Sequence, residues 1–244
     1  MVDGARWILI IKAGSTMPSL QSRRGDFEHW ILRGMGATPA EAEVVNVEAG
    51  ERLPDHQAYA AVAITGSHAM VTDHREWSDR AAAWLAEEVR LGTPVLGVCY
   101  GHQLLGYALG GHVADNPKGR ELGTVPLWLE AEAQSDPLLR DLPPSIPVQA
   151  SHTQSVLRMP SGAVRLASSS MDANHAVRFA RNTWGVQFHP EFDAEVLREY
   201  IRASREELAA EGRDPDQALR EIQETALSAT VLRRFAGIAR RAAR

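Results

Sequence analysis

Cysteine is nearly absent from this chain of 244 residues, which has a single one at position 99. One cysteine cannot form an intramolecular disulfide and cannot make a zinc site by itself, so a disulfide-stabilised secreted scaffold is excluded. Long hydrophobic runs are lacking too: none approaches the roughly 20 residues of a membrane-spanning helix, and the apolar stretch near the N-terminus is too short for a signal peptide. We therefore expect a cytoplasmic protein without membrane association.

An excess of positive charge is also missing. The formal net charge is -5, with 23% charged and 44% hydrophobic residues, which is ordinary for a globular protein. This composition does not indicate binding to nucleic acid. A chain of this length can bury a substantial core, and we expect one domain with an appendage.

Short, nearly continuous apolar runs are what the sequence does contain. They cover residues 6–11, 60–65 and 93–98, with helical patterns at 26–32 and 77–91 between them. Such runs suit parallel strands that are buried on both faces. The alternation predicts an α/β fold with a doubly wound, mostly parallel central sheet, helices on both faces, and a functional crevice beyond the carboxyl ends of the strands.

Residues 111–187 have a hydrophobic period nearer two than 3.6, which predicts an antiparallel extension of the sheet. Within them, PSG at 160–162 and RNTWG at 181–185 are predicted to be hairpin turns. From Asp193 the pattern is helical again, with a stop at Gly212 and a second helix from Asp214 through Ala229. We divide the chain into residues 1–192 and a C-terminal helical extension, 193–244, that packs on the same domain.

Two sets of residues in the C-terminal extension have a predicted role. The first set is apolar and is expected to pack against the sheet: Val196, Ile201, Leu219 and Ile222. The second set is a cluster of arginines near the C-terminus: Arg233, Arg234, Arg240, Arg241 and Arg244. We interpret this cluster as a solvated helix end, where positive charge is favourable, and keep docking of an acidic partner as the alternative.

The stretch GVCYG, residues 97–101, places the lone cysteine between two glycines. This is the layout of a nucleophile on a sharp strand-to-helix turn, where glycines permit close approach of the two backbones. The thiol of Cys99 would lie at the N-terminus of a helix beginning near Gly101, where free N–H groups and the helix dipole favour an anion. Because the thiolate is the nucleophilic form, we interpret Cys99 as a nucleophile rather than a small buried hydrophobe.

A nucleophile of this kind needs a base, and the chain has nine histidines. His189 ends the apolar stretch GVQFH, and Glu191 follows two residues later. A strand end would deliver His189 to the carboxyl edge of the sheet, beside Cys99, as a base oriented by Glu191. Four other histidines lie in polar or helical stretches and are expected at the surface: His29, His56, His74 and His175.

Together these two motifs carry a resemblance to a known family. PVLGVCYGHQLLGYALGG (94–111) with GVQFHPEF (185–192) resembles the class I, or triad, glutamine amidotransferases, and more narrowly their stand-alone members similar to GMP synthases. The likeness runs from about residue 8 to residue 192 and includes VAITGSHAMV, NPKGRELGTV and ASHTQSV. It implies the flavodoxin-like architecture of that family.

The resemblance also implies roles for particular residues. Cys99 would be the nucleophile, His189 the base and acid, and Glu191 the carboxylate that orients the imidazole. The backbone N–H groups of Gly66 and Tyr100 would donate to the oxyanion. The substrate glutamine would be held by Gln103 and by the SHTQ segment, which consists of Ser151, His152, Thr153 and Gln154.

The sequence departs from the family pattern at two places. Ser67 and His68 stand where many relatives have glycine, and we expect them to narrow or reshape the oxyanion loop. A misaligned loop would give low basal activity until a partner or acceptor sets it. Thr153 and Gln154 stand where GMP synthases have glycine and aspartate, so the substrate contacts are expected to differ there.

The implied reaction is hydrolysis of the glutamine side-chain amide through a thioester on Cys99, which gives glutamate and ammonia. The chain contains no GxxxxGK[ST] or SGGxDS-like nucleotide loop, so we expect a separate synthetase subunit to use the ammonia. No cofactor is expected. The alternative substrate is another γ-glutamyl amide, because the same triad chemistry would cleave it with a different leaving group.

Three further alternatives lie outside this reaction. A non-catalytic regulatory module of the same fold would lack a member of the triad, and a redox or stress protein of the related cysteine-elbow group would have a different carboxylate arrangement. A zinc enzyme needs ligands with suitable spacing. The chain has no second cysteine, and several of its histidines lack such spacing: His68, His74, His102, His112 and His152. No metal is therefore expected.

Overall fold

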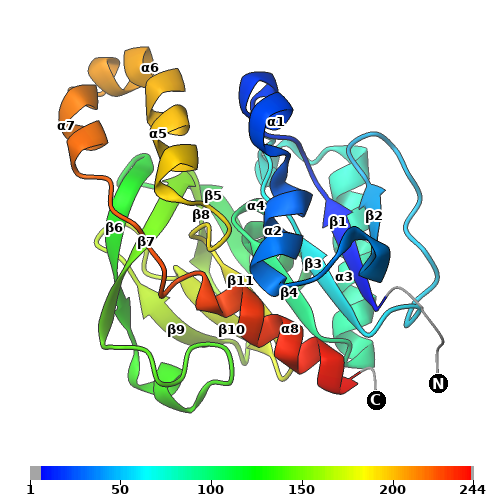
Figure 1. Cartoon of the computed structure of the whole chain (residues 1–244). Coiled ribbons are helices and arrows are strands. Elements are labelled where there is room, and N and C mark those ends of the chain that lie inside the picture. Colours follow the sequence, from blue (N-terminus) through cyan, green and yellow to red (C-terminus); the bar gives the residue numbers. More distant parts are fainter. Residues whose placement is uncertain (1–6, 243–244) are drawn as a thin grey trace.

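The computed structural model describes residues 7–242, in which strands and helices alternate along the chain (Figure 1). The strands are β1 (Ile8–Lys12), β2 (Ala42–Asn46), β3 (Ala61–Ile64), β4 (Val95–Val98), β5 (His112–Asp115), β6 (Glu121–Leu129), β7 (Ser145–His152), β8 (Gln154–Arg158), β9 (Val164–Ser168), β10 (Ala176–Ala180) and β11 (Thr183–Val186). The α-helices are α1 (Pro18–Arg24), α2 (Phe27–Met35), α3 (Glu76–Leu91), α4 (Tyr100–Ala108), α5 (Ala194–Ala203), α6 (Arg205–Ala210), α7 (Pro215–Arg220) and α8 (Thr230–Ala242). Short 3-10 helices occupy Pro39–Glu41, Val71–Asp73 and Ala131–Ser135.

Nine of the described strands form one sheet in the order β2-β1-β3-β4-β11-β10-β9-β6-β7. The pairs from β2 to β11 are parallel, and the pairs from β11 to β7 are antiparallel. Strands β5 and β8 pair separately as an antiparallel ribbon. The predicted α/β sheet with a parallel core and an antiparallel extension is therefore confirmed, although β11 joins the parallel core through β4.

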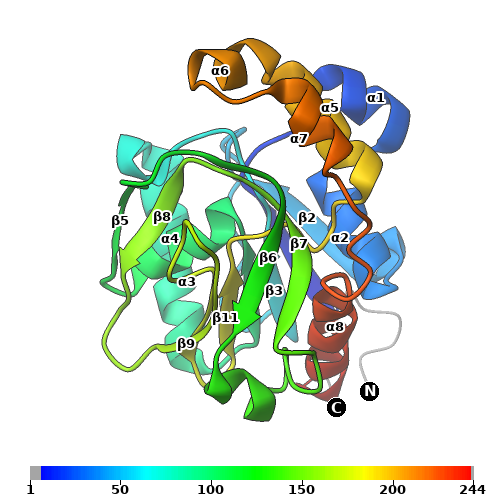
Figure 2. The same ribbon diagram turned by 90° about the vertical axis from the view of Figure 1, so that its left-hand side faces the viewer.

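Both faces of the parallel core are covered, which explains its continuous apolar runs. In β1, Ile8 and Ile10 join a buried cluster with side chains of α2 and α8, whereas Leu9 and Ile11 join a second cluster with side chains of α3 and α4. Figure 2 shows α2 and α8 on one side of the sheet and α3 and α4 on the other. This arrangement leaves the carboxyl ends of the strands as the place where loops from several strands meet.

Helix boundaries follow local capping signals. Asp26 caps α2 in a capping box with His29, and the helix continues beyond the predicted 26–32 to Met35, followed by a left-handed Gly36. The predicted end of the second helix at residue 91 is confirmed, because Gly92 adopts φ 84° and closes α3. The apolar pattern does not reveal β2, because this strand lies at the sheet edge, where Glu43 interrupts the apolar run and Val44 is exposed.

One of the two predicted hairpins is confirmed and the other is wrong. Residues 181 and 182 join β10 to β11, which pair antiparallel as the RNTWG motif predicts. Residues 160–162 join β8 to β9, but these strands do not pair: β8 bonds to β5, and β9 bonds to β10 and β6. A turn sequence fixes a local change of direction, whereas the choice of partner depends on which faces must be buried.

The C-terminal helices do not pack as predicted. Val196 and Ile201 of α5, together with Ile222, are buried against α1, α2 and the start of β6 rather than on the sheet face. The predicted helix from residue 214 to 229 ends at Arg220. Among the described C-terminal helices α5 to α8, α8 is the one that packs on the sheet, with Val231 among its buried residues. Apolar periodicity continues through residues 221–229, but these residues form turns that lead from one packing surface to the other.

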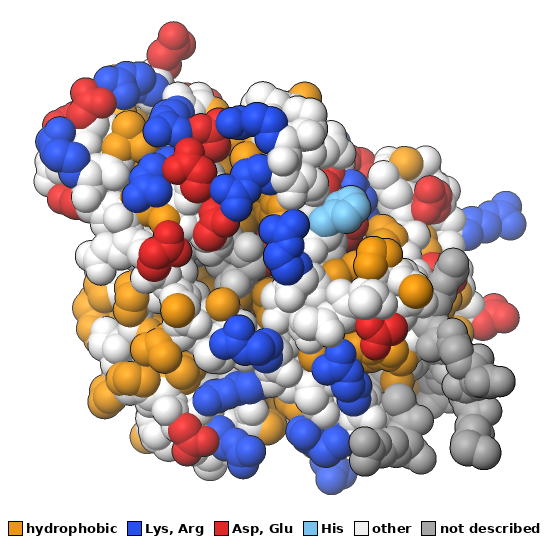
Figure 3. Space-filling view, in the orientation of Figure 1, with side chains coloured by type: hydrophobic (Ala, Val, Ile, Leu, Met, Phe, Trp, Pro, Cys, Tyr) orange, Lys and Arg blue, Asp and Glu red, His pale blue; other side chains and the backbone are white. Residues whose placement is uncertain are grey.

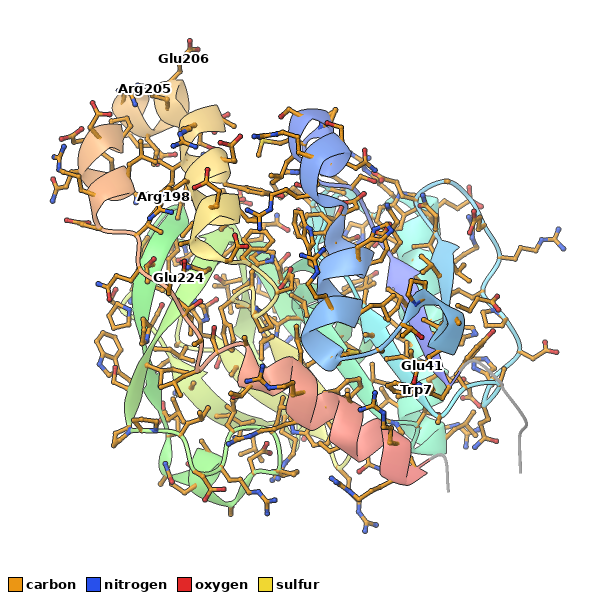
Figure 4. The ribbon with its side chains drawn as sticks, viewed as in Figure 1. Trp7, Glu41, Arg198, Arg205, Glu206 and Glu224 are labelled. Carbon is orange, nitrogen blue, oxygen red and sulfur yellow. The ribbon has the colours of Figure 1, made fainter. Side chains whose placement is uncertain are left out.

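Two of the clustered arginines make contacts within the chain. Arg234 donates to the backbone oxygens of Leu138 and Arg140, and Arg240 lies over the ring of Trp7 at 5.0 Å while donating to Gly36. Trp7 in turn donates to Glu41, which lies beside it in Figure 4. The hypothesis of an acidic docking partner therefore rests on Arg233 and Arg241, and Arg244 lies outside the described residues.

Within residues 7–242, none of the helices combines the length and apolar character that a bilayer-spanning helix needs.

Candidate active site

Cys99 stands on the sharp turn between β4 and α4, with φ 51° and ψ -101°. A Cβ atom added to Gly97 would lie 2.3 Å from the carbonyl oxygen of Gly101, and one added to Gly101 would lie 2.7 Å from that of Ile64. Both approaches are too close for any side chain. The glycines flanking the cysteine therefore permit the tight turn, as the motif predicts.

His189 lies at the end of the segment that follows β11, where it is 3% exposed. Its Nδ1 is 2.7 Å from Oε1 of Glu191, whose side chain is fully buried. The ring also stacks on Phe192, with centroids 4.0 Å apart. These contacts fix the plane of the imidazole and leave Nε2 as the nitrogen free to exchange a proton.

The electrostatic environment favours a protonated His189. Burial alone would lower its pKa, but the charges of Glu191 and Cys99, and hydrogen bonds with both, outweigh burial and raise the pKa to about 10. An imidazolium beside a sulfur stabilises the thiolate form of that sulfur. The site therefore brings a cysteine sulfur and a protonated imidazole together, although their residues are 90 positions apart in the sequence.

The sulfur of Cys99 has further polar neighbours. Nε2 of Gln187 lies 3.6 Å away, and the carbonyl oxygen of Ser151 lies 3.7 Å away. The sulfur also lines a cavity of about 310 Å³, which is small for a ligand pocket. A compact substrate could reach the sulfur through this cavity.

Of the two residues expected to form an oxyanion hole, Tyr100 follows Cys99 in the chain and Gly66 lies beside His189. Tyr100 is the first residue of α4, so its N–H has no partner within the helix, and Gly66 approaches His189 so closely that an added Cβ would lie 3.2 Å from the ring. The hydroxyl of Thr65 donates to the carbonyl oxygen of Gly66 and accepts from the N–H of Ala13. Among residues 7–242, no acceptor is seen for the N–H of Gly66 or of Tyr100.

Of the residues expected to hold substrate, five line the cavity with Cys99: Gln103, Ser151, His152, Thr153 and Gln154. The side chain of Gln103 already donates to the carbonyl oxygen of Gln154 at 2.8 Å and to Oε1 of Gln187 at 3.1 Å. The side chain of Gln154 donates to Thr72 and Asp115. The side-chain NH2 groups of Gln103 and Gln154 are therefore already bonded to acceptors within the protein.

The side chain of His152 also belongs to a buried cluster that sequence spacing did not reveal. Its Nε2 and that of His175 each lie 2.9 Å from Oε2 of Glu121, and the hydroxyl of Ser169 donates to Oε1. His175 is fully buried, so its predicted surface position is wrong. His29, His56 and His74 are more exposed, with 57%, 37% and 57% of each side chain accessible.

Glu121 is ionised within this cluster. Burial would raise its pKa, but hydrogen bonds from His152 and His175 and their charges hold it far below the usual range. The three ligand-type atoms lie within 4.8 Å of one another, a grouping that could also hold a metal ion. The 2.9 Å separations at Oε2 are those of N–H···O hydrogen bonds, and Oε1 accepts from the hydroxyl of Ser169, so both carboxylate oxygens have partners within the protein.

The far wall of the cavity comes from α5 and α6. Tyr200, Ser204 and Glu207 line it, and Glu207 pairs with Arg120, which also lines the cavity. Tyr200 stacks on His68 with centroids 5.9 Å apart. Figure 3 shows positive and negative side chains intermingled over these helices. The ion pairs Arg23–Glu199 and Arg120–Glu207 connect α5 and α6 to other parts of the chain.

The family comparison agrees with this geometry. Residues 24–204 match the family model described as glutamine amidotransferase class-I. The chain belongs to this family. The matched residues contain both the cysteine elbow and the HPE stretch at 189–191.

Known members show different degrees of similarity. The amidotransferase is 36% identical over 172 residues to a glutamine-hydrolyzing GMP synthase of Aeropyrum pernix, an overlap of 68% of this chain and 31% of that protein. It is 40% identical over 99 residues to one subunit of the glutamine-hydrolyzing GMP synthase of Methanosarcina acetivorans, an overlap of 40% of this chain and 50% of that protein. The chain thus spans about a third of the first of these two relatives and half of the second.

Solved structures support the fold. A glutamine amidotransferase from Methylobacillus flagellatus superposes with a TM-score of 0.74 at 25% identity, over 97% of this chain and 94% of that one. The agreement extends across nearly the whole amidotransferase and therefore includes the C-terminal helices that line the cavity.

Proposed function

We propose that this class I glutamine amidotransferase hydrolyses the side-chain amide of glutamine through a thioester on Cys99. The observation that carries the proposal is the junction of three side chains from two segments far apart in the sequence: Cys99 on its elbow, and His189 with Glu191, which is bonded to Nδ1 of His189 at 2.7 Å. A nucleophile, a base and an orienting carboxylate in this order form the arrangement of covalent acyl transfer.

In the first step, the thiolate of Cys99 attacks the carboxamide carbon and forms a tetrahedral oxyanion. The oxyanion collapses to a thioester as the imidazolium of His189 gives its proton to the departing ammonia. His189, now neutral, takes a proton from water, which attacks the thioester and releases glutamate. Glu191 stabilises the charged ring and keeps Nε2 directed at the reaction in both steps.

Gly66 and Tyr100 are proposed to stabilise the oxyanion through their backbone N–H groups. Removing one such donor costs on the order of 10² to 10³ in rate, so alignment of this loop controls activity. Ser67 and His68 stand in the same loop, and His68 is held by stacking on Tyr200. We propose that this contact restrains the loop and keeps basal activity low until a partner or acceptor shifts it.

Substrate recognition is assigned to Gln103 and to residues 151–154. The Nε2 of Gln103 is engaged by two acceptors, so its Oε1 is the atom available to accept from a substrate N–H. The exposed hydroxyl of Thr153 and the unpartnered Oε1 of Gln154 are further candidates for polar contacts. The cavity suits an amino acid amide better than a large conjugate.

The acceptor of ammonia is proposed to be a separate synthetase subunit. Support comes from the relatives, one of which is named as one subunit of a glutamine-hydrolyzing GMP synthase. One observation favours the second candidate, a γ-glutamyl amide hydrolase: α5 and α6 close one wall of the cavity with Tyr200, Ser204 and Glu207. A wall made by the chain itself can recognise a leaving group without a partner.

The test is to incubate the purified protein with glutamine and with a panel of γ-glutamyl amides, measuring glutamate, ammonia and amine. Release of ammonia from glutamine, abolished in Cys99→Ala, supports the glutaminase. Amine release from a conjugate at a much higher kcat/KM than glutamine turnover favours the hydrolase instead. A fast basal rate with glutamine alone contradicts the restrained loop.

A further inference from the structure

We propose that Gln187 is a further catalytic residue, which stabilises the Cys99 thiolate through its side-chain N–H, and that Gln103 is the positioning residue that orients it. The inference rests on the proposed function, since it assigns a role in activating the same nucleophile. Gln187 is fully buried two residues before His189, and its Nε2 lies 3.6 Å from the sulfur.

The direction of this contact follows from the hydrogen-bond partners. The carbonyl oxygen of Gln154 can only accept, so the group of Gln103 that faces it at 2.8 Å must be the NH2 group. The same NH2 group faces Gln187 at 3.1 Å, so Gln187 must present its oxygen to Gln103. The NH2 group of Gln187 is then the end that faces Cys99.

We call this series of contacts, from the carbonyl oxygen of Gln154 through Gln103 to Gln187, the relay. Its first member is itself held in place. The Gln154 carbonyl oxygen also lies 3.0 Å from Nδ1 of His152, whose Nε2 faces the ionised Glu121. The ring of His152 thus connects this carbonyl oxygen to the buried carboxylate of Glu121. This connection holds the carbonyl that orients Gln103, and Gln103 in turn orients Gln187.

The sulfur thus lies between a donor and an acceptor. In the thiol state its S–H can donate to the carbonyl oxygen of Ser151 at 3.7 Å. In the thiolate state that carbonyl repels the sulfur, whereas the N–H of Gln187 attracts it. Gln187 therefore offsets the repulsion by Ser151 and, with His189, selects the ionised form that attacks the substrate.

This role separates two interpretations of Gln103. If Gln103 only binds substrate, its replacement leaves the reactivity of Cys99 unchanged when no substrate is present. If Gln103 orients Gln187, its replacement frees the Gln187 amide to rotate and turn its oxygen toward the sulfur. Reactivity toward a small neutral reagent then falls even without glutamine.

The experiment measures the rate of Cys99 alkylation by iodoacetamide from pH 5 to pH 10, without substrate, in the full chain. The variants are Gln187→Met, which keeps the size and removes the donor, Gln187→Glu, which places an acceptor against sulfur, and Gln103→Met. The matched control is Gln149→Met, because Gln149 is also fully buried and bonded at both ends, to Thr124 and Gln223.

We expect the pH of half-maximal alkylation to rise by about one unit in Gln187→Met, because a hydrogen bond to a charged group is lost. Gln187→Glu should shift it further, and Gln103→Met should shift it in the same direction. A profile unchanged in Gln187→Met, or shifted equally in Gln149→Met, overturns the proposal. Should Gln187→Met fail to fold, Gln103→Met decides: a rise supports the relay and an unchanged profile overturns it.

The alkylation assay does not depend on turnover. A wild-type protein that hydrolyses no γ-carboxamide would overturn the proposed function while leaving the relay testable. Conversely, if the wild-type protein hydrolyses glutamine but the variants keep the wild-type alkylation profile, the proposed function stands and the relay is overturned.

Discussion

Nδ1 of His189 lies 2.7 Å from Oε1 of Glu191, and the carboxylate is shielded completely from solvent. Shielding strengthens the interaction, because few water dipoles compete for either charge. The carboxylate therefore does more than orient the ring: together with Cys99 it outweighs the effect of burial on the pKa of His189.

Glu191→Gln should lower kcat for glutamine hydrolysis by roughly 10³ to 10⁴, since the neutral amide neither stabilises the imidazolium nor enforces the tautomer. KM should change little, because Glu191 does not line the cavity. Glu195→Gln is the control, as Glu195 pairs only with exposed arginines of α5. Equal kcat values for the two variants in a steady-state assay would show that Glu191 takes no part in catalysis.

The alkaline limb of the pH profile should reflect His189. Its pKa is raised to about 10, so kcat should fall as pH rises through about 10 and the ring loses the proton needed by departing ammonia. For the same reason the ring contributes folding stability that is fully present below about pH 6.5 and is lost as pH rises through about 10. Initial rates and circular dichroism spectra are measured at each pH. Together they separate a loss of activity in the folded protein from unfolding. Constant activity to pH 11 in folded protein contradicts this assignment.

Gly97→Ala should destabilise the protein by about 1–3 kcal/mol, because its Cβ would lie 2.3 Å from the backbone of Gly101. Gly237→Ala makes the same chemical change in α8, where the nearest atom is the end of a flexible arginine at 3.7 Å. That variant should be stabilised by about 0.5–1 kcal/mol through helix propensity. Urea unfolding of both variants checks the prediction, and equal stabilities would show that the elbow is not tightly packed.

Glu121→Gln should cost about 3 kcal/mol or more at pH 7, because it removes the buried ionised carboxylate to which His152 and His175 are both bonded. The pKa of Glu121 is lowered by folding, so its stabilisation is present above the unfolded value of about 4.5 and is lost as pH falls below it. The difference from wild type should therefore shrink under acid. Urea midpoints at pH 7 and pH 4 measure it.

The control for that comparison is Glu206→Gln, a change in an exposed side chain that projects into solvent from α6 (Figure 4). It should leave both midpoints within about 0.5 kcal/mol of wild type. A pH-independent cost in Glu121→Gln would mean that the carboxyl is not held ionised by its histidines.

Features encoded by adjacent residues could be predicted from the sequence. The elbow at Cys99 depends on flanking glycines, and the tight hairpin at residues 181 and 182 depends on its own turn. The parallel core followed from apolar runs such as β1, which is buried on both faces. Cys99 and His189 were placed together because parallel strands end at the same edge of a sheet.

Features that depend on distant partners were not predicted. Glu121, His152 and His175 meet only because β6 and β7 pair and the loop before β10 folds back, and no spacing along the chain reveals this. Residues 221–229 keep a helical apolar period but lie where the chain crosses between two surfaces. Gln187 lies inside the GVQFHPEF motif, yet its partner Gln103 is 84 residues away.

The most direct test of the central claim is mass spectrometry of the protein quenched in acid during turnover of glutamine. The account predicts a mass increase of one γ-glutamyl group on the peptide that contains Cys99, removed by hydroxylamine and absent in Cys99→Ala. Glutamine turnover with no adduct on Cys99, or turnover that survives in Cys99→Ala, would contradict it.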